Sequence, residues 1–210
     1  MLSSSLIAMP STDFRSALIA HLRAEAKPVD KFSHQPRLYA LCQAVGKGAD
    51  YDDDIVFAAA WLHDLGVFIG HRPEEPEVLA KWDNVAYACQ RAPGILRQLG
   101  FPEAKIPAVV AVISQHFPGR EPESTEAIIL RDADILEQLG AAGILRTVSK
   151  VGRDTRFITH ADALRALRKT LATLPGQLRL PRARELAEPR IVALRSLLDQ
   201  AAAEAPDELW

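Results

Sequence analysis

The apolar run Ile55–Leu62 is followed directly by His63 and Asp64, and this junction constrains the fold more than any other feature. A helix with apolar residues on every side is expected to be buried. Burying an imidazole beside a carboxylate is costly unless both groups have partners. Because a divalent metal binds imidazole nitrogen and carboxylate oxygen together, the junction predicts a buried metal site.

Helical periodicity dominates the chain, and alternating β-branched runs are nearly absent, so we predict an all-α, multi-helix bundle. The length of 210 residues predicts one domain, 1–210, with a core over 30–150 and C-terminal helices over 160–204 packed on it. Proline and glycine breakers separate the predicted helices. These helices span residues 12–26, 33–47, 52–66, 78–99, 103–115, 124–149, 160–173 and 182–204.

Composition limits the cellular location and the classes of binding partner that we expect for this protein. A net charge of −2 argues against nucleic acid as the main partner. No apolar run is long enough to span a membrane, and the first ten residues lack the basic and long apolar regions of a secretory signal. Cys42 and Cys89 lie in apolar helical patterns, which is typical of reduced, packed thiols. We therefore expect a cytoplasmic protein.

Charge is unevenly distributed along the chain. Residues 145–195 contain twelve Lys or Arg against four acidic residues, whereas residues 49–83 contain nine acidic residues against two basic ones. Solvated helix faces explain such runs in most proteins. The alternative is a basic wall that faces an anionic substrate, with Lys169 as a candidate phosphate contact.

Three separated motifs occur in the order His, His-Asp, Asp, all on predicted helices. They are Phe32–Tyr39 with His34, Leu62–Gly66 with His63-Asp64, and Asp132–Leu136 with Asp134. This pattern resembles the HD-domain superfamily of metal-dependent phosphohydrolases over roughly residues 30–150. The segments Leu139–Arg146 and Ala183–Ala187 are similar to its bacterial branch that includes nucleoside-triphosphate pyrophosphohydrolases.

The resemblance implies that His34, His63, Asp64 and Asp134 bind one divalent metal. Manganese is favoured in this branch, and magnesium, nickel and cobalt are the other candidates. Such a metal activates a water molecule as the nucleophile and polarises the phosphate, which gives Asp64 a catalytic role. Arg37, one turn after His34, would face the same site and bind a phosphate group.

The choice between Asp132 and Asp134 exposes a conflict. The helical neighbours of Asp132 are apolar, so periodicity makes it the inward-facing carboxylate. The neighbours of Asp134 are more polar, but the family pattern points to Asp134. We select Asp134, because core periodicity is expected to fail at an active site.

His116 ends a predicted helix beside a turn, and two interpretations of it stay open. It is either a substrate-contacting acid or hydrogen-bond donor, or a histidine stabilised by the helix dipole. Two-metal HD proteins have two further histidines, and Asn84 lies in the region where one of them would be. We therefore favour a single metal.

The expected function is hydrolysis of a nucleotide or a related phosphate ester or anhydride, with a small phosphorylated molecule as the partner. One alternative is an HD-fold metal-binding regulatory module without turnover. A less favoured alternative is an HD-fold di-iron oxygenase, which needs more histidines than the chain offers. A homodimer is compatible with the sequence but is not indicated by any motif.

Overall fold

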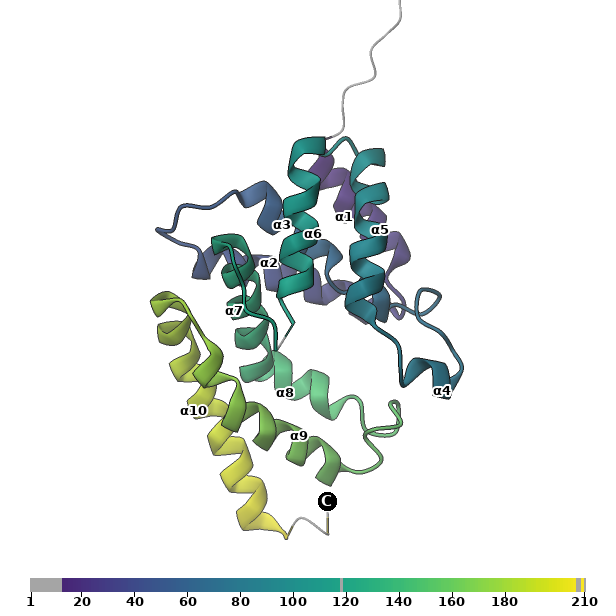
Figure 1. Ribbon diagram of the computed structural model, residues 1–210. Coiled ribbons are helices and arrows are strands. Elements are labelled where there is room, and N and C mark those ends of the chain that lie inside the picture. Colours follow the sequence, from purple (N-terminus) through teal and green to yellow (C-terminus); the bar gives the residue numbers. More distant parts are fainter. Residues whose placement is uncertain (1–12, 118, 207–208, 210) are drawn as a thin grey trace, which may run out of the picture.

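The computed structural model describes residues 13–117, 119–206 and 209, and the regular elements of these residues are all helices, which confirms the predicted all-α class. Figure 1 labels the α-helices: α1 (Phe14–Glu25), α2 (His34–Val45), α3 (Asp53–Leu62), α4 (Pro76–Leu79), α5 (Asn84–Gln98), α6 (Ile106–Gln115), α7 (Thr125–Leu139), α8 (Ala141–Val148), α9 (His160–Thr173) and α10 (Pro181–Glu204). The short 3-10 helices are η1 (Val29–Ser33), η2 (Leu65–Val67), η3 (Glu103–Lys105) and η4 (Pro175–Gln177). None of the described helices is both long and apolar enough to cross a membrane.

Helix α3 is the most deeply buried element, because residues 55–62 all lie in the core. Its start is fixed by Asp52, whose side chain accepts hydrogen bonds from the backbone N–H groups of Asp54 and Ile55. The helix packs against α1, α2, α6 and α7, which cover its apolar surface on several sides. The residues after Leu62 therefore emerge inside the bundle.

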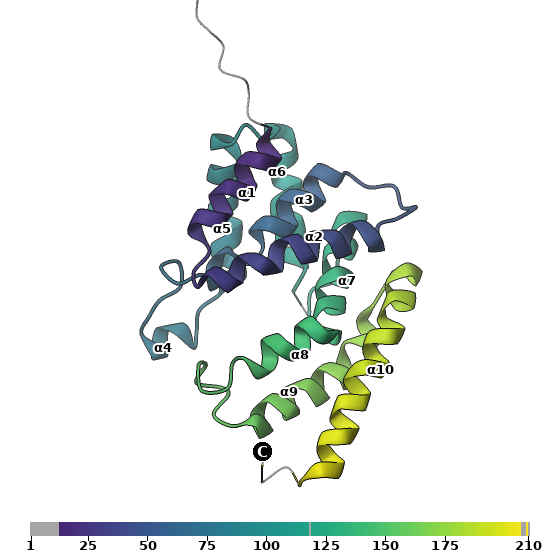
Figure 2. The same cartoon turned by 180° about the vertical axis from the view of Figure 1, so that it is seen from behind.

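Helix α7 connects two groups of helices, α1–α6 as the first half of the structure and α8–α10 as the second. It packs against α2, α3 and α6 in the first half and against α8 and α10 in the second. Figures 1 and 2 show α8, α9 and α10 grouped together, away from α1 and α5. Ser124 caps α7 by accepting a hydrogen bond from the backbone N–H of Ala127.

Two of the predicted helices are each divided in the structure. The expected helix 124–149 breaks at Gly140, whose extended backbone separates α7 from α8. The expected helix 78–99 is interrupted before Asp83. The Asp83 side chain accepts a hydrogen bond from the backbone N–H of Ala86 and caps the start of a separate helix, α5. The third predicted helix ends earlier than expected, at Leu62.

The corner between α7 and α8 depends on a close backbone approach. A Cβ atom at position 143 would lie 2.1 Å from the carbonyl oxygen of Gln138. Only glycine leaves room there, so Gly143 fixes how closely α8 returns towards the end of α7. By contrast, a Cβ atom at Gly94 in α5 would have no neighbour within 4 Å.

We predict that Gly143→Ala lowers the free energy of unfolding by about 1–3 kcal/mol, the usual range for overpacking. Gly94→Ala is the matched control, and it should raise stability by about 0.5–1 kcal/mol because alanine favours a helix interior. Urea unfolding followed by circular dichroism measures both changes. If both substitutions changed the free energy of unfolding equally, the close approach at Gly143 would be contradicted.

Candidate metal centre

Two buried histidines meet where α2 packs against α3. His34 is the first residue of α2, and His63 comes directly after the last residue of α3. Their exposed fractions are only 4% and 1%. The ring centroids lie 5.2 Å apart. The buried apolar run of α3 thus carries His63 to a partner that is 29 residues away in the sequence.

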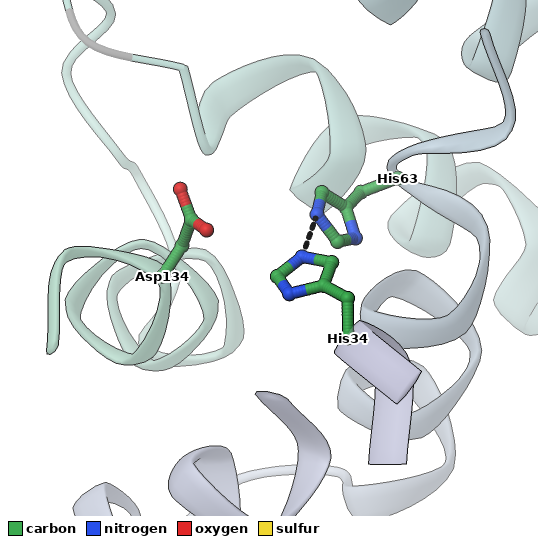
Figure 3. A group of neighbouring side chains, drawn as sticks. All are labelled: His34, His63 and Asp134. Atoms are coloured by element: carbon green, nitrogen blue, oxygen red, sulfur yellow. Dashed lines mark hydrogen bonds between the residues drawn. The ribbon is translucent and has the colours of Figure 1, made fainter. Parts of the chain in front are cut away.

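The hydrogen bonds of the two rings require a proton on each Nδ1 atom. Nδ1 of His63 donates to the carbonyl of Ala60 over 3.0 Å, and Nδ1 of His34 donates to the Glu137 carboxylate. The two Nε2 atoms then face each other at 3.2 Å, the contact that is dashed in Figure 3. Burial lowers the pKa of His63 to about 4, so its ring is neutral at pH 7. At this distance the two Nε2 atoms can share one proton in a hydrogen bond, and without that proton both lone pairs can bind one cation between them.

Two carboxylates lie beside the facing rings. Asp134 lies across from both rings in Figure 3, and its carboxylate and the two rings offer ligand atoms within 4.8 Å of one another. The Asp64 oxygens lie 3.5 Å from Nε2 of His34 and 3.6 Å from Nε2 of His63. Although burial opposes ionisation of Asp64, the surrounding imidazoles and Arg146 hold its pKa below its usual value. We call His34, His63, Asp64 and Asp134 the four-residue cluster.

The donor set of the four-residue cluster fits a divalent cation. Ligand atoms about 2.1 Å from a shared metal lie roughly 3 Å apart, and the Nε2 atoms of His34 and His63 have this spacing. Neutral imidazoles and ionised carboxylates are the forms that bind metal. Two nitrogen and two oxygen donors leave coordination positions for water or a substrate oxygen.

Asp132 lies on the same helix as Asp134 but serves a different partner. It is fully buried, and its carboxylate accepts the backbone N–H groups of Arg179 at 3.1 Å and Leu180 at 2.8 Å. Leu180 is the residue before α10, so Asp132 anchors the start of the C-terminal helix. Burial raises the pKa of Asp132 despite these hydrogen bonds. Periodicity correctly gave Asp132 an inward position, but that position faces α10.

Glu137 and Arg146 were not expected from the sequence. Glu137 is 3% exposed and accepts hydrogen bonds from His34 Nδ1, Arg37 Nε and Arg146 Nη1. These partners keep the pKa of Glu137 low although burial opposes its ionisation. The spacing of Glu137 from Asp134, three residues along one helix, is the only sequence signal that places it beside the cluster.

The remaining candidates occupy varied positions. Arg37 donates its Nε to Glu137 over 2.9 Å, and its side chain stays 43% exposed. His116 is buried at the end of α6, with its ring 5.0 Å from that of His63 and its Nδ1 donating to Ile113. Lys169 is exposed on α9, which packs mainly on α8 and α10. No contact among the described residues connects Lys169 with the cluster.

Comparisons with known structures agree with this architecture. YpgQ from Bacillus subtilis, solved in complex with ADP, matches with a TM-score of 0.71 and 22% identity over 94% of this chain and 98% of that one. A predicted HD superfamily hydrolase from an uncultured Thermotogales bacterium matches with a TM-score of 0.63 and 24% identity, over 90% and 91% of the two chains. An HD-superfamily hydrolase from Bacillus thuringiensis gives 0.66 and 20%, over 90% and 94%. These similarities show a shared fold.

The sequence itself was compared with protein families and with curated proteins. The search of curated proteins found no match. The family model described as HD domain matches residues 32–139, which is just over half of the chain. The matched segment includes His34, His63 and Asp134, so the residues that meet in space are those that lie within the family region. This protein is therefore a member of the HD domain family.

Proposed function

We propose that this protein is a metal-dependent phosphohydrolase that acts on a nucleotide or a related phosphate ester or anhydride. The observation that carries the proposal is the pair of Nε2 atoms, 3.2 Å apart, with both Nδ1 atoms already donating elsewhere. Such a pair can bind one shared cation, and the adjacent carboxylates would complete a ligand set for one divalent metal. The hydrolase fold of the solved relatives supports the reaction class.

His34, His63, Asp64 and Asp134 would hold the metal, and manganese is the ion we favour over magnesium, nickel and cobalt. When bound, a divalent metal lowers the pKa of a water molecule and neutralises phosphate charge. The low pKa of Asp64 makes this carboxylate a poor proton acceptor, so its catalytic part is to bind and orient. Its side chain is 20% exposed, which leaves it open towards a substrate.

His116 is the residue we assign to proton donation. Its Nδ1 proton is held by the carbonyl of Ile113, so a second proton binds at Nε2 and can be donated from there to a leaving oxygen. Arg37 is a secondary candidate for phosphate contact, because Nε is its bonded atom and the guanidinium is partly exposed. Lys169 stays a weaker candidate.

A nucleotide is the substrate class that we favour. The support is the B. subtilis relative solved in complex with ADP, which covers 94% of this chain. In our proposal the substrate is a small phosphorylated molecule in the cytoplasm.

The first test measures metal content and turnover together. Purified protein should contain about one metal per chain and release phosphate or pyrophosphate from nucleotides with added Mn²⁺. His63→Ala, checked by circular dichroism for folding, should lose both. Bound metal without release from any nucleotide would favour the regulatory module, and no metal in either protein would overturn the ligand assignment.

The second test separates the two aspartates of α7. We expect Asp134→Ala to lose the metal and keep its stability. Asp132→Ala should keep the metal but lose about 1–3 kcal/mol of stability, because two buried backbone N–H groups lose their acceptor. Elemental analysis and urea unfolding give the two readouts. Metal loss in Asp132→Ala alone would reverse the assignment.

The third test concerns the carboxylate behind His34. Glu137→Gln removes the negative charge that orients the His34 ring, so metal affinity should fall about 10–100-fold. Competition with a chromophoric chelator measures the affinity. Glu126→Gln is the control, because Glu126 lies on the same helix and accepts a backbone hydrogen bond from Asp52 that glutamine can retain. Equal affinities for both variants and the unmodified protein would exclude the orienting role.

A further inference from the structure

The end of α8 and the loop after it hold several cations close to the four-residue cluster. Arg146 lies in the last turn of α8, and Lys150 lies four residues later, in the turn that follows the helix. Arg156 lies in the loop, and Lys31 lies in η1, three residues before His34. Arg146, Lys150 and Arg156 belong to the basic stretch that the sequence contains between residues 145 and 195.

Arg146 links this group of cations to the cluster. Its Nη1 donates to Glu137 and lies 3.0 Å from Nδ1 of His34, because both nitrogen atoms meet the same carboxylate oxygen. The charge of Arg146 also contributes to the low pKa of Asp64. The cationic group therefore begins within direct contact of the residues that surround the proposed metal.

Lys150 is the unusual member of the group. Its ammonium is partly buried, and its pKa is lowered first by burial and then by Arg156, Arg146 and Lys31. Asp154, which raises the pKa of Lys150, is itself bound by Arg156 through bonds of 3.0 and 2.7 Å. Among the described residues, no hydrogen bond or ion pair joins the Lys150 ammonium to an acidic side chain.

The contact that the structure does give this ammonium is aromatic. Lys150 Nζ lies 5.2 Å from the centre of the Phe157 ring, which Arg156 also approaches at 6.0 Å. A ring face attracts cations but does not neutralise them. Arg146 and Arg156 are each paired with an acid, whereas the half-buried ammonium of Lys150 has no such ion pair within the described part of the chain. An anion with several charges would supply the charge that Lys150 lacks.

We propose that Lys150, with Arg146, Arg156 and Lys31 around it, binds the phosphate groups of the substrate that lie beyond the one at the four-residue cluster. The inference rests on the proposed phosphohydrolase function and narrows it to substrates with a chain of two or more phosphates. A monophosphate would leave this subsite empty. The chemistry is shared by nucleoside polyphosphates and inorganic polyphosphate.

The test measures binding by isothermal titration calorimetry to the full-length protein loaded with Mn²⁺. The probes are inorganic tripolyphosphate, ATP and orthophosphate. In Lys150→Gln the affinity for tripolyphosphate and for ATP should fall at least tenfold, while that for orthophosphate should change less than twofold. Lys47→Gln removes an exposed charge just beyond the far end of α2 and should change none of the three. Loss of tripolyphosphate affinity alone would assign the subsite to inorganic polyphosphate, whereas unchanged tripolyphosphate affinity would overturn the proposal.

A second readout keeps the test informative if binding is weak. Because the unpaired ammonium is unfavourable without ligand, Lys150→Gln should raise the melting temperature of the ligand-free protein, whereas a structural lysine would lower it. Unchanged tripolyphosphate affinity in Lys150→Gln, in a protein that hydrolyses nucleotides with metal, would refute the subsite alone. Absence of any hydrolysis, with tripolyphosphate binding that still depends on Lys150, would refute the proposed function and leave the subsite in place.

Discussion

The buried carboxylate of Glu137 is the constraint on which the centre of this molecule depends. An ionised carboxylate at 3% exposure is tolerated only when its partners replace the water that it loses. Those partners are His34 and Arg37 of α2 and Arg146 of α8, so one side chain of α7 joins three helices. The same contacts orient the His34 ring so that its Nε2 faces His63. The contacts of Glu137 therefore both hold the helices together and position a residue of the site.

Most of the fold could be predicted from the sequence, because periodicity and capping are local properties. The eight apolar residues of α3 and the cap at Asp52 are examples. The break at Gly140 was missed, since the residues on both sides continue a helical pattern and glycine alone does not end a helix. What decides that break is the approach of α8 to α7, which is a contact in space.

The residues of the candidate site likewise divide into those that the sequence predicts and those that it does not. The histidines and Asp134 could be proposed from motifs, and the structure places them together. Glu137 could not, because its partner Arg37 is 100 residues away and periodicity gives no information about which charged groups meet. The expectation for Arg37 named a phosphate as its partner, whereas the structure gives it a carboxylate. The ligand roles themselves remain predictions.

The Gly143 corner has a consequence for how this region can vary. It fixes the direction in which α8 leaves α7, and Arg146 lies three residues after Gly143, on the side that meets Glu137. Each residue added to a helix rotates all later residues of that helix by about 100°. A single inserted residue between Gly143 and Arg146 would therefore turn the guanidinium away from Glu137 and carry the cations beyond it to another face. The length of this segment is constrained more strictly than the identity of its outward-facing side chains.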